Sequence, residues 1–278
     1  MTQYKTRQFG DRDRLAVLDI ETMAPATPDG SFPPWPLHLP LVASVLKATL
    51  QRYGEWRFAI ESVNFQSDEA EAIERVSHLI ENRRLITFNG RGFDNPVLAL
   101  TAMKHQKYEL AGIGQAWQTH RFTGHHYDVA DVISSHGGAR GGSLEMLCAQ
   151  LGIPAKQDCH GADVAELAAK GEFKIIQDYC ESDVAATLAL YACVEGLRSC
   201  DPGYAGSLIS QFGRWVADSG LDHLQAFEQM VGHEEHDRLS LLNMVQQGVA
   251  ALDHRQHMKF VMNVPGPSGV FKPQHSDF

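Results

Sequence analysis

The sequence lacks the features that define several large classes of protein. No apolar run approaches the roughly 18 to 20 residues of a membrane-spanning helix, and residues 1–7 contain no apolar signal-peptide core. The five cysteines are odd in number and form no Cys-x-x-Cys pair, so neither a disulfide framework nor a zinc site is expected. We therefore expect a cytoplasmic protein with reduced, buried thiols and no membrane partner.

Positive charge is also scarce. The 24 lysines and arginines are outnumbered by 34 aspartates and glutamates, which gives a formal net charge of −10. This balance argues against a protein that coats nucleic acid nonspecifically, because such a surface carries an excess of positive charge. It does not exclude an enzyme that holds a few nucleotides at a metal-filled cleft, since bound cations neutralise the phosphates there.

One short apolar segment ends in two carboxylates. Residues 15–18 follow a charged stretch and are typical of a strand buried on both faces of a sheet. Side chains alternate along a strand, so Asp19 and Glu21 project from the same face at its end. A divalent cation relieves the repulsion between such carboxylates, and their hard oxygens suit Mg²⁺ or Mn²⁺. For an isolated Asp-x-Glu, however, a strand that runs into a polar loop is the better interpretation.

The segment after Glu21 is rich in proline and indicates a loop. Within it, Phe32 and Trp35 either stack on nucleobases or anchor the loop to the core, and packing is the better interpretation. Residues 41–50 and 56–63 then predict a hairpin. The strand that carries the two carboxylates is thus followed by two antiparallel partners.

Strand and helix patterns alternate in the next part of the chain. From Ser67, a candidate N-cap, apolar positions recur at helical spacing as far as residue 82. Residues 85–88 form a buried strand that leads into a loop, where Asn95 is a candidate cap and Pro96 fits the first helical position. Asp94 is therefore held at a strand-to-helix junction. The alternation predicts an α/β sheet flanked by helices.

The longest helical pattern, residues 172–196, carries Tyr179 and Asp183 four positions apart and hence on one face. On a surface helix both would be ordinary residues. In a helix packed on a sheet, an inward aspartate needs a partner, because an unpaired buried charge is costly, and a metal ion would supply one. A glycine-rich segment before this helix carries Arg140, which is either a phosphate contact or part of a solvated loop.

A change in composition near residue 201 divides the chain. We expect residues 1–200 to form the main domain and residues 201–260 to form two or three amphipathic helices packed on it. Residues 261–278 are rich in proline and glycine and predict a loose tail.

Three motifs together resemble those of the DEDD exonuclease superfamily. They are Asp-x-Glu at Asp19, Asn-x-x-x-Phe-Asp ending at Asp94 and Tyr-x-x-x-Asp ending at Asp183. The tyrosine subgroup (DEDDy) is indicated, because the histidine form would place a histidine where this chain has Asp178. Residues 10–230 resemble, more narrowly, the predicted 3′–5′ exonucleases related to the proofreading domain of family B DNA polymerases. Supporting segments are residues 32–34, 126–128, 151–154 with Lys156, and 180–184, while Ala155 stands where a glycine is expected.

The resemblance implies a ribonuclease H-like fold and hydrolysis of phosphodiester bonds at the 3′ ends of single-stranded DNA or RNA, with DNA favoured. Two Mg²⁺ or Mn²⁺ ions roughly 4 Å apart would be bound. Asp19 would bridge both ions, Glu21 and Asp183 would complete one, and Asp94 would support the other. By the same analogy Tyr179 orients the attacking water, since tyrosine's ordinary pKa near 10 makes it a poor base. The expected substrate contacts are Thr22, Met23, Asn89, Arg91, Phe93, Arg140 and Lys156.

Two alternatives stay open at this point. One is an exonuclease that trims RNA or short oligonucleotides, because the sequence does not choose the sugar. The other is a catalytically idle binding module that uses the C-terminal helices to bind a protein partner, which the sequence does not identify. The presence of all four carboxylates argues against the idle module.

Overall fold

A five-stranded mixed sheet forms the centre of the computed structural model, which describes residues 11–29, 31–51, 54–122, 125–139, 142–155 and 163–232. The strand order is β3-β2-β1-β4-β5; β1, β2 and β3 pair antiparallel, whereas β4 and β5 run parallel to β1. This arrangement confirms the expected ribonuclease H-like α/β fold. The strands are β1 (Arg14–Met23), β2 (Leu39–Leu50), β3 (Trp56–Asn64), β4 (Arg84–Thr87) and β5 (His126–Asp128).

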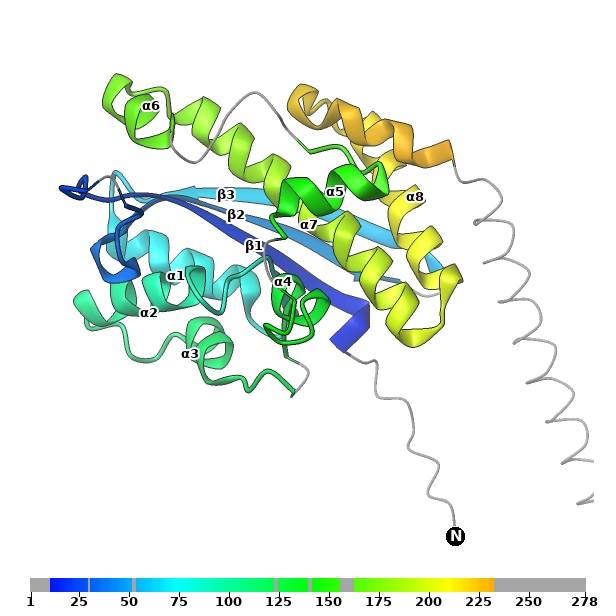
Figure 1. Ribbon diagram of the computed structural model, residues 1–278, viewed down its shortest axis with the longest axis horizontal. Helices are drawn as coiled ribbons and strands as arrows, with labels where there is room; N and C mark the ends of the chain where they lie inside the picture. Colours follow the sequence, from blue (N-terminus) through cyan, green and yellow to red (C-terminus); the bar gives the residue numbers. More distant parts are fainter. Residues whose placement is uncertain are drawn as a thin grey trace, which may run out of the picture.

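Helices cover both faces of the sheet (Figure 1). One layer contains α1 (Glu69–Ile80), α2 (Asp94–Lys104) and α3 (Ala111–Gln118). The other contains α4 (Val129–Ile133), α5 (Leu144–Leu151), α6 (Val164–Lys170), α7 (Phe173–Ser199), α8 (Pro202–Ser219) and the 3₁₀ segment η5 (Asp222–Gly232). Two short 3₁₀ turns, η1 (Asp11–Asp13) and η2 (Trp35–Leu37), precede β1 and β2. Within the described residues, no helix is both long and apolar enough to cross a bilayer.

Side chains alternate along β1, and this alternation decides which face of the sheet its carboxylates lie on. Ala16, Leu18 and Ile20 pack in the core beneath α1 and α2, whereas Leu15 and Val17 pack in the core shared with α7. Asp19 and Glu21 have the same parity as Leu15 and Val17, so the period of two directs them toward α7. A β-bulge opposite these residues shifts the β1–β2 register between Glu21 and Thr22.

The described C-terminal segments share a buried core with α7 and the sheet. Leu208, Phe212 and Val216 of α8 and Leu224 and Phe227 of η5 belong to the same buried core as α7 and β1. The second segment is a 3₁₀ helix rather than the expected α-helix. The helix expected at residues 239–252 and the tail at 261–278 lie outside the described residues, and the domain boundary near residue 200 stays a prediction.

Two predicted helix starts are wrong, by one residue at α1 and by two residues at α2. The N-cap of α1 is Asp68 rather than Ser67, because the Asp68 carboxylate accepts the backbone N–H groups of Ala70 and Glu71, both at 2.9 Å. Helix α2 begins at Asp94, so neither Asn95 nor Pro96 has its expected capping position.

The expected burial of the thiols is correct only in part. Cys148 and Cys180 are buried, Cys193 is half-buried and Cys200 is exposed, while Cys159 lies outside the described residues.

Candidate active site

Three carboxylates from two distant segments meet at the end of β1. Oxygen atoms of Asp19, Glu21 and Asp183 all lie within 4.8 Å of one another. β1 supplies the first two, and α7 supplies the third, one turn after Tyr179. The structure therefore joins the first and third sequence motifs in one place.

Asp94 adds a fourth charge to this group from the start of α2. Burial is the largest cause that raises the pKa of Asp19 well above its usual range, and the charges of Asp94, Glu21 and Asp183 raise it further. Burial likewise raises the pKa of Glu21, followed by the charges of Asp183 and Asp94. All four predicted carboxylates are thus electrostatically coupled.

The pKa of Asp94 depends on two opposing effects, burial and backbone hydrogen bonds. Its pKa is raised to about 7, chiefly by burial, although hydrogen bonds from its own backbone N–H and that of Ile20 act in the opposite direction. Buried carboxylates that repel one another are costly to ionise without a counter-charge. Since oxygen ligands of this kind suit Mg²⁺ and Mn²⁺, the donor set fits divalent metal ions.

A buried thiol connects the two segments that carry Asp19 and Asp183. The Cys180 Sγ lies 3.4 Å from the backbone oxygen of Asp19 and 3.5 Å from its Oδ2, and it donates to both. Burial is the main cause that raises the pKa of Cys180, so the thiol stays protonated and remains a donor. Sequence reasoning missed this contact because Cys180 lies 161 residues from Asp19.

The second motif forms a tight loop held by Asp128. The Asp128 carboxylate accepts the backbone N–H groups of Asn89 and Arg91, both at 2.9 Å. Asn89 has a left-handed φ of 62°, and a Cβ at Gly90 would lie 2.6 Å from the Cβ of Thr87. Only glycine fits position 90. Asp128 is a positioning residue that the second motif alone did not reveal, although it ends the supporting segment 126–128.

The Arg91 guanidinium, a predicted phosphate contact, is bonded to two backbone oxygens. Its Nη1 donates to the backbone oxygen of Thr119 at 2.7 Å, and its Nη2 donates to that of His126 at 2.6 Å. These bonds join the second motif to the segment before β5, so the guanidinium acts in the fold. Arg140 and Lys156, the other two predicted cations, lie outside the described residues.

Aromatic rings contact one another beside Thr22 and in the loop before Asp94. Phe32 stacks on His38 with ring centroids 4.8 Å apart, and Phe93 meets His38 edge-on at the same distance. The Thr22 hydroxyl lies 2.7 Å from His38 Nδ1, and Met23 is partly exposed at the end of β1. The packing interpretation is wrong for Phe32, because 74% of this residue is exposed.

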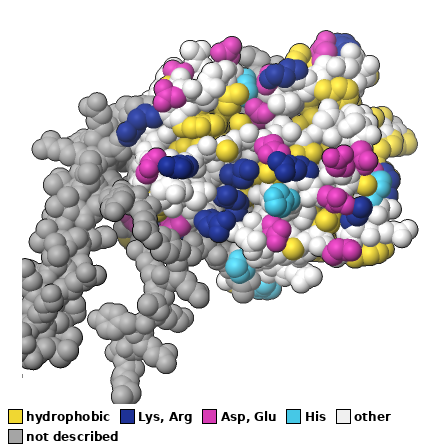
Figure 2. Space-filling view, turned by 180° about the vertical axis from the view of Figure 1, so that it is seen from behind, with side chains coloured by type: hydrophobic (Ala, Val, Ile, Leu, Met, Phe, Trp, Pro, Cys, Tyr) yellow, Lys and Arg dark blue, Asp and Glu magenta, His cyan; other side chains and the backbone are white. Residues whose placement is uncertain are grey.

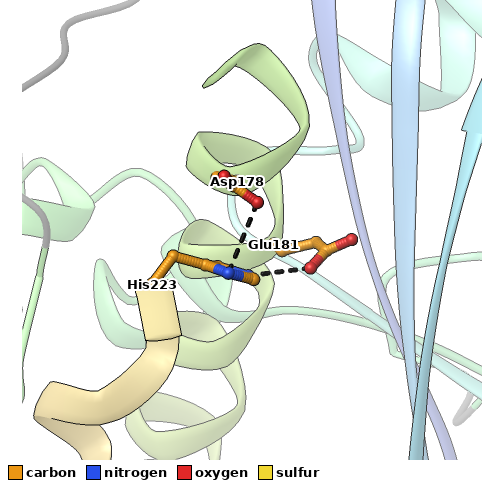
Figure 3. Close-up of side chains that lie close together, drawn as sticks. All are labelled: Asp178, Glu181 and His223. Atoms are coloured by element: carbon orange, nitrogen blue, oxygen red, sulfur yellow. Dashed lines mark hydrogen bonds and ion pairs between the residues drawn. The ribbon is translucent and has the colours of Figure 1, made fainter. Parts of the chain in front are cut away.

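A second acidic group lies in the same part of α7 as Tyr179. His223 of η5 contacts Asp178, one residue before Tyr179, and Glu181, two residues after it (Figure 3). Glu181 Oε1 also accepts the Ser62 hydroxyl at 2.7 Å and the Gln177 amide at 2.8 Å. Sheet, η5 and α7 are therefore fixed to one another where the third motif begins.

Positive charge gathers away from the carboxylates. Figure 2 shows a group of Lys and Arg side chains on the back of the molecule. Arg14 begins β1, so five residues at about 3.3 Å each place it roughly 17 Å from Asp19 along the strand. A hollow of about 290 Å³ at that end of the sheet is lined by Arg14, Lys47, Arg75, His78 and Arg83, among others.

The fold and this carboxylate cluster define a class: a ribonuclease H-like protein with a group of carboxylates that could hold a metal ion. Residues 30–231 match the family described as predicted 3′–5′ exonucleases related to the exonuclease domain of PolB, and the chain belongs to this family. The matched range includes Asp94, Tyr179 and Asp183. Asp19 and Glu21 precede it, and the structure brings them to the others.

One of the solved structures to which the chain is similar is a DNA polymerase. The family B DNA polymerase from the hyperthermophilic archaeon Pyrobaculum calidifontis is 16% identical, with a TM-score of 0.43. That match covers 77% of this chain and 27% of the polymerase chain. No curated protein matches the sequence.

Proposed function

We propose that the protein is a 3′–5′ exonuclease that depends on two divalent ions, Mg²⁺ or Mn²⁺, and shortens single-stranded nucleic acid, with DNA favoured. The observation that carries this proposal is the meeting of Asp19, Glu21 and Asp183 in one cluster to which Asp94 is coupled. Membership of a predicted 3′–5′ exonuclease family supports the reaction class and a nucleic-acid substrate.

The carboxylates have distinct proposed roles. The charges of the other three all act on Asp19, which supports it as the ligand shared by two ions. Glu21 and Asp183 would complete one ion site, and Asp94 would support the other. When bound, the ions would activate water and neutralise charge on the reacting phosphate.

Tyr179 is the proposed water-positioning residue. It is half-buried on α7, one turn before Asp183, so its hydroxyl can act next to the same cluster. Tyrosine's ordinary pKa near 10 favours a hydrogen-bonding role over proton abstraction at neutral pH. This role supports assignment to the tyrosine subgroup, DEDDy.

The proposed contacts with the substrate lie in the segments next to Glu21 and Asp94. Thr22 and Met23 extend β1 beyond Glu21, and Asn89 and Phe93 lie in the loop before Asp94. We place the 3′-terminal nucleotide between these two segments. Lys156 and Arg140 remain candidate phosphate contacts.

A nuclease assay of the purified chain tests the proposal. Labelled single- and double-stranded DNA and RNA are incubated with Mg²⁺, Mn²⁺ or EDTA, and the position of the label distinguishes shortening from the 3′ end from shortening from the 5′ end. We expect 3′ shortening of single-stranded DNA with either metal and none with EDTA. Faster cleavage of RNA would favour the trimming alternative, and binding without hydrolysis under every condition would favour the idle module.

A further inference from the structure

The hollow of about 290 Å³ at the far end of β1 from the carboxylate cluster has a mostly basic lining. We call it the basic hollow, and its charged and polar walls include Arg14 of β1, Lys47 of β2, Arg75 and His78 of α1, and Glu81 and Arg83 of the connection to β4. The chain as a whole carries a net charge of −10. A local excess of positive charge in such a chain requires a specific explanation.

The two strand residues of the basic hollow occupy positions where the sheet elsewhere faces the core. Arg14 has the same parity as Ala16 and Leu18 of β1, and Lys47 has the same parity as Val45 of β2. Those three apolar side chains pack beneath α1, so the period of two directs both cations to the same face of the sheet. Arg14 is exposed and Lys47 is half-buried. The cations therefore stand on a part of this face that α1 leaves open to solvent.

Arg83 is held in place, although part of its guanidinium remains free. Its Nη1 donates to the backbone oxygen of Leu15 at 3.3 Å and lies 3.0 Å from the Thr49 hydroxyl, to which it also donates. Its Nε and Nη2 donate to no group in the described part of the chain. Burial is the main cause that lowers the pKa of Arg83, and the charge of Arg14 lowers it further. An anion at this point would relieve the repulsion between the two guanidinium groups and accept the free donors.

Only one of the four strong cations in the basic hollow is paired. The Nε and Nη2 atoms of Arg75 donate to the Glu61 carboxylate at 2.5 and 2.9 Å, so these two charges cancel. Among the residues that the structure describes, Arg14, Lys47 and Arg83 have no carboxylate within 4.0 Å. Three positive charges therefore remain to be balanced.

The remaining negative charge at the basic hollow is too small to balance them. Glu81 carries one negative charge, and the C-terminal end of α1 contributes about half a charge more. An excess of about 1.5 positive charges remains, which matches a phosphate monoester, at about −1.5 to −2 near pH 7, better than the single charge of a phosphodiester. The volume of about 290 Å³ lies at the lower end of the range for small-molecule sites, roughly 300 to 1,000 Å³.

We infer that the basic hollow binds a phosphate group, at a site separate from the carboxylate cluster. The guanidinium groups of Arg14 and Arg83 would donate to the phosphate oxygens, and the Lys47 ammonium would add a third positive charge. Charge and volume favour the terminal phosphate of a small molecule over a phosphate within a strand. The inference does not rest on the proposed function, because none of these residues takes part in the proposed hydrolysis.

Calorimetric titration of the full chain in EDTA tests the inference without relying on turnover, because no metal ion can then hold the ligand at the carboxylate cluster. Inorganic phosphate, deoxyadenosine 5′-monophosphate, a long single strand of DNA and a peptide of aspartates are titrated separately. We expect the first two to bind. Arg14→Ala/Lys47→Ala should weaken their binding at least about 10-fold, because two contacts with charged groups are lost.

Matched variants separate this site from the general charge of the protein. Lys104→Ala/Lys170→Ala removes the same charge at two exposed lysines that are paired with glutamates elsewhere, and it should leave every dissociation constant unchanged. Arg14→Lys/Lys47→Arg keeps the charge and should retain binding. Melting temperatures of all variants check that the fold is kept.

The four ligands distinguish the possible sources of the phosphate. If Arg14→Ala/Lys47→Ala weakens binding of the long strand while free phosphate does not bind, the phosphate site is kept and its ligand is a strand that passes this end of the sheet. Tighter binding of the aspartate peptide than of either phosphate compound would overturn the inference in favour of an acidic protein partner. Equal phosphate binding by the parent protein and the double variant, or binding of none of the four ligands, would also overturn it.

Discussion

His223 holds Glu181 through a contact of 2.8 Å between Nε2 and Oε2, and this contact joins η5 to the turn of α7 that carries Tyr179. Nδ1 of the same ring lies 3.3 Å from Asp178 Oδ1. Burial acts to raise the pKa of Glu181, but the hydrogen bonds from His223, Ser62 and Gln177 outweigh it and the pKa is lowered. Glu181 is thus a buried carboxylate that these partners keep charged.

Removal of this histidine should destabilise the protein. We expect His223→Ala to lower the free energy of unfolding by about 1–3 kcal/mol, because Glu181 keeps its Ser62 and Gln177 donors but loses its third partner. Denaturant unfolding measures the change. His78→Ala, at an exposed position on α1, is the control and should stay within about 0.5 kcal/mol of the parent protein. Equal effects of the two substitutions would show that the contact adds no stability.

The carboxylate cluster should be essential for hydrolysis, and it should destabilise the metal-free protein. Asp19→Asn should lower activity at least about 10³-fold while the fold is kept, because a shared metal ligand is lost. The metal-free variant should melt at the same temperature or higher, since burial and three neighbouring charges penalise ionised Asp19. Asp218→Asn, at an exposed position on α8, is the control. Full activity of Asp19→Asn would refute the proposed site.

Tyr179 and Asp183 should affect different quantities. Tyr179→Phe should slow single-turnover hydrolysis by about 10²- to 10³-fold, the loss typical of one positioned catalytic group, with metal binding nearly unchanged. Asp183→Ala, one turn further along α7, should weaken metal binding itself. Calorimetric titration with Mn²⁺ beside the kinetics separates the two effects. A Tyr179→Phe variant with full turnover would identify the tyrosine as a packing residue.

The metal-free protein should lose stability as the pH rises. The pKa of Asp94 is raised from 3.8 to about 7, so its stabilising contribution is complete below about 3.8 and is lost as the pH rises toward 7. The raised pKa values of Asp19 and Glu21 act in the same direction. Melting temperatures in EDTA at pH 5 to 8 measure the slope, which Asp94→Asn should reduce. Saturating Mn²⁺ should raise the melting temperature at pH 8 most, and a flat profile in EDTA would contradict the assignment.

Binding of nucleic acid should depend strongly on metal. With a net charge of −10 and Arg91 bonded to backbone oxygens, few cations are expected to reach the phosphates, so affinity in EDTA should be weak and its salt dependence shallow. Dissociation constants between 50 and 200 mM salt, with and without Mn²⁺, provide the measurement. The double variant Arg14→Ala/Lys47→Ala should bind short strands as the parent does, because these residues lie at the other end of β1. Tight binding to long duplex DNA without metal would contradict this prediction.

Local periodicities allowed the sequence to predict much of the candidate site. The alternation of a strand places Asp19 and Glu21 on one face, and the spacing of a helix places Tyr179 beside Asp183. Both rules depend only on backbone geometry within a few residues. The strand and helix pattern likewise predicted the α/β sheet, although the starts of α1 and α2 differ from the predicted ones by one and two residues.

Residues that act through distant contacts could not be predicted in this way. His38, Asp128 and His223 contact partners that lie 16, 39 and 42 residues away, and no sequence period connects them. The surroundings of Arg91 and Phe32 also depend on distant contacts. The Arg91 guanidinium donates to two backbone oxygens, and Phe32, which was expected to pack, is largely exposed.

The sequence by itself therefore determined which carboxylates stand at the ends of strands and on the inner face of a helix, because those positions follow from local backbone geometry. The tertiary structure decided that segments more than 150 residues apart meet at one place, as β1 and α7 do through Cys180 and Asp19. It also decided which polar groups form hydrogen bonds with one another, as Asp128 does with the backbone of Asn89 and His223 does with Glu181. Those outcomes depend on how the packed layers bring distant side chains together, and no local pattern contains that information.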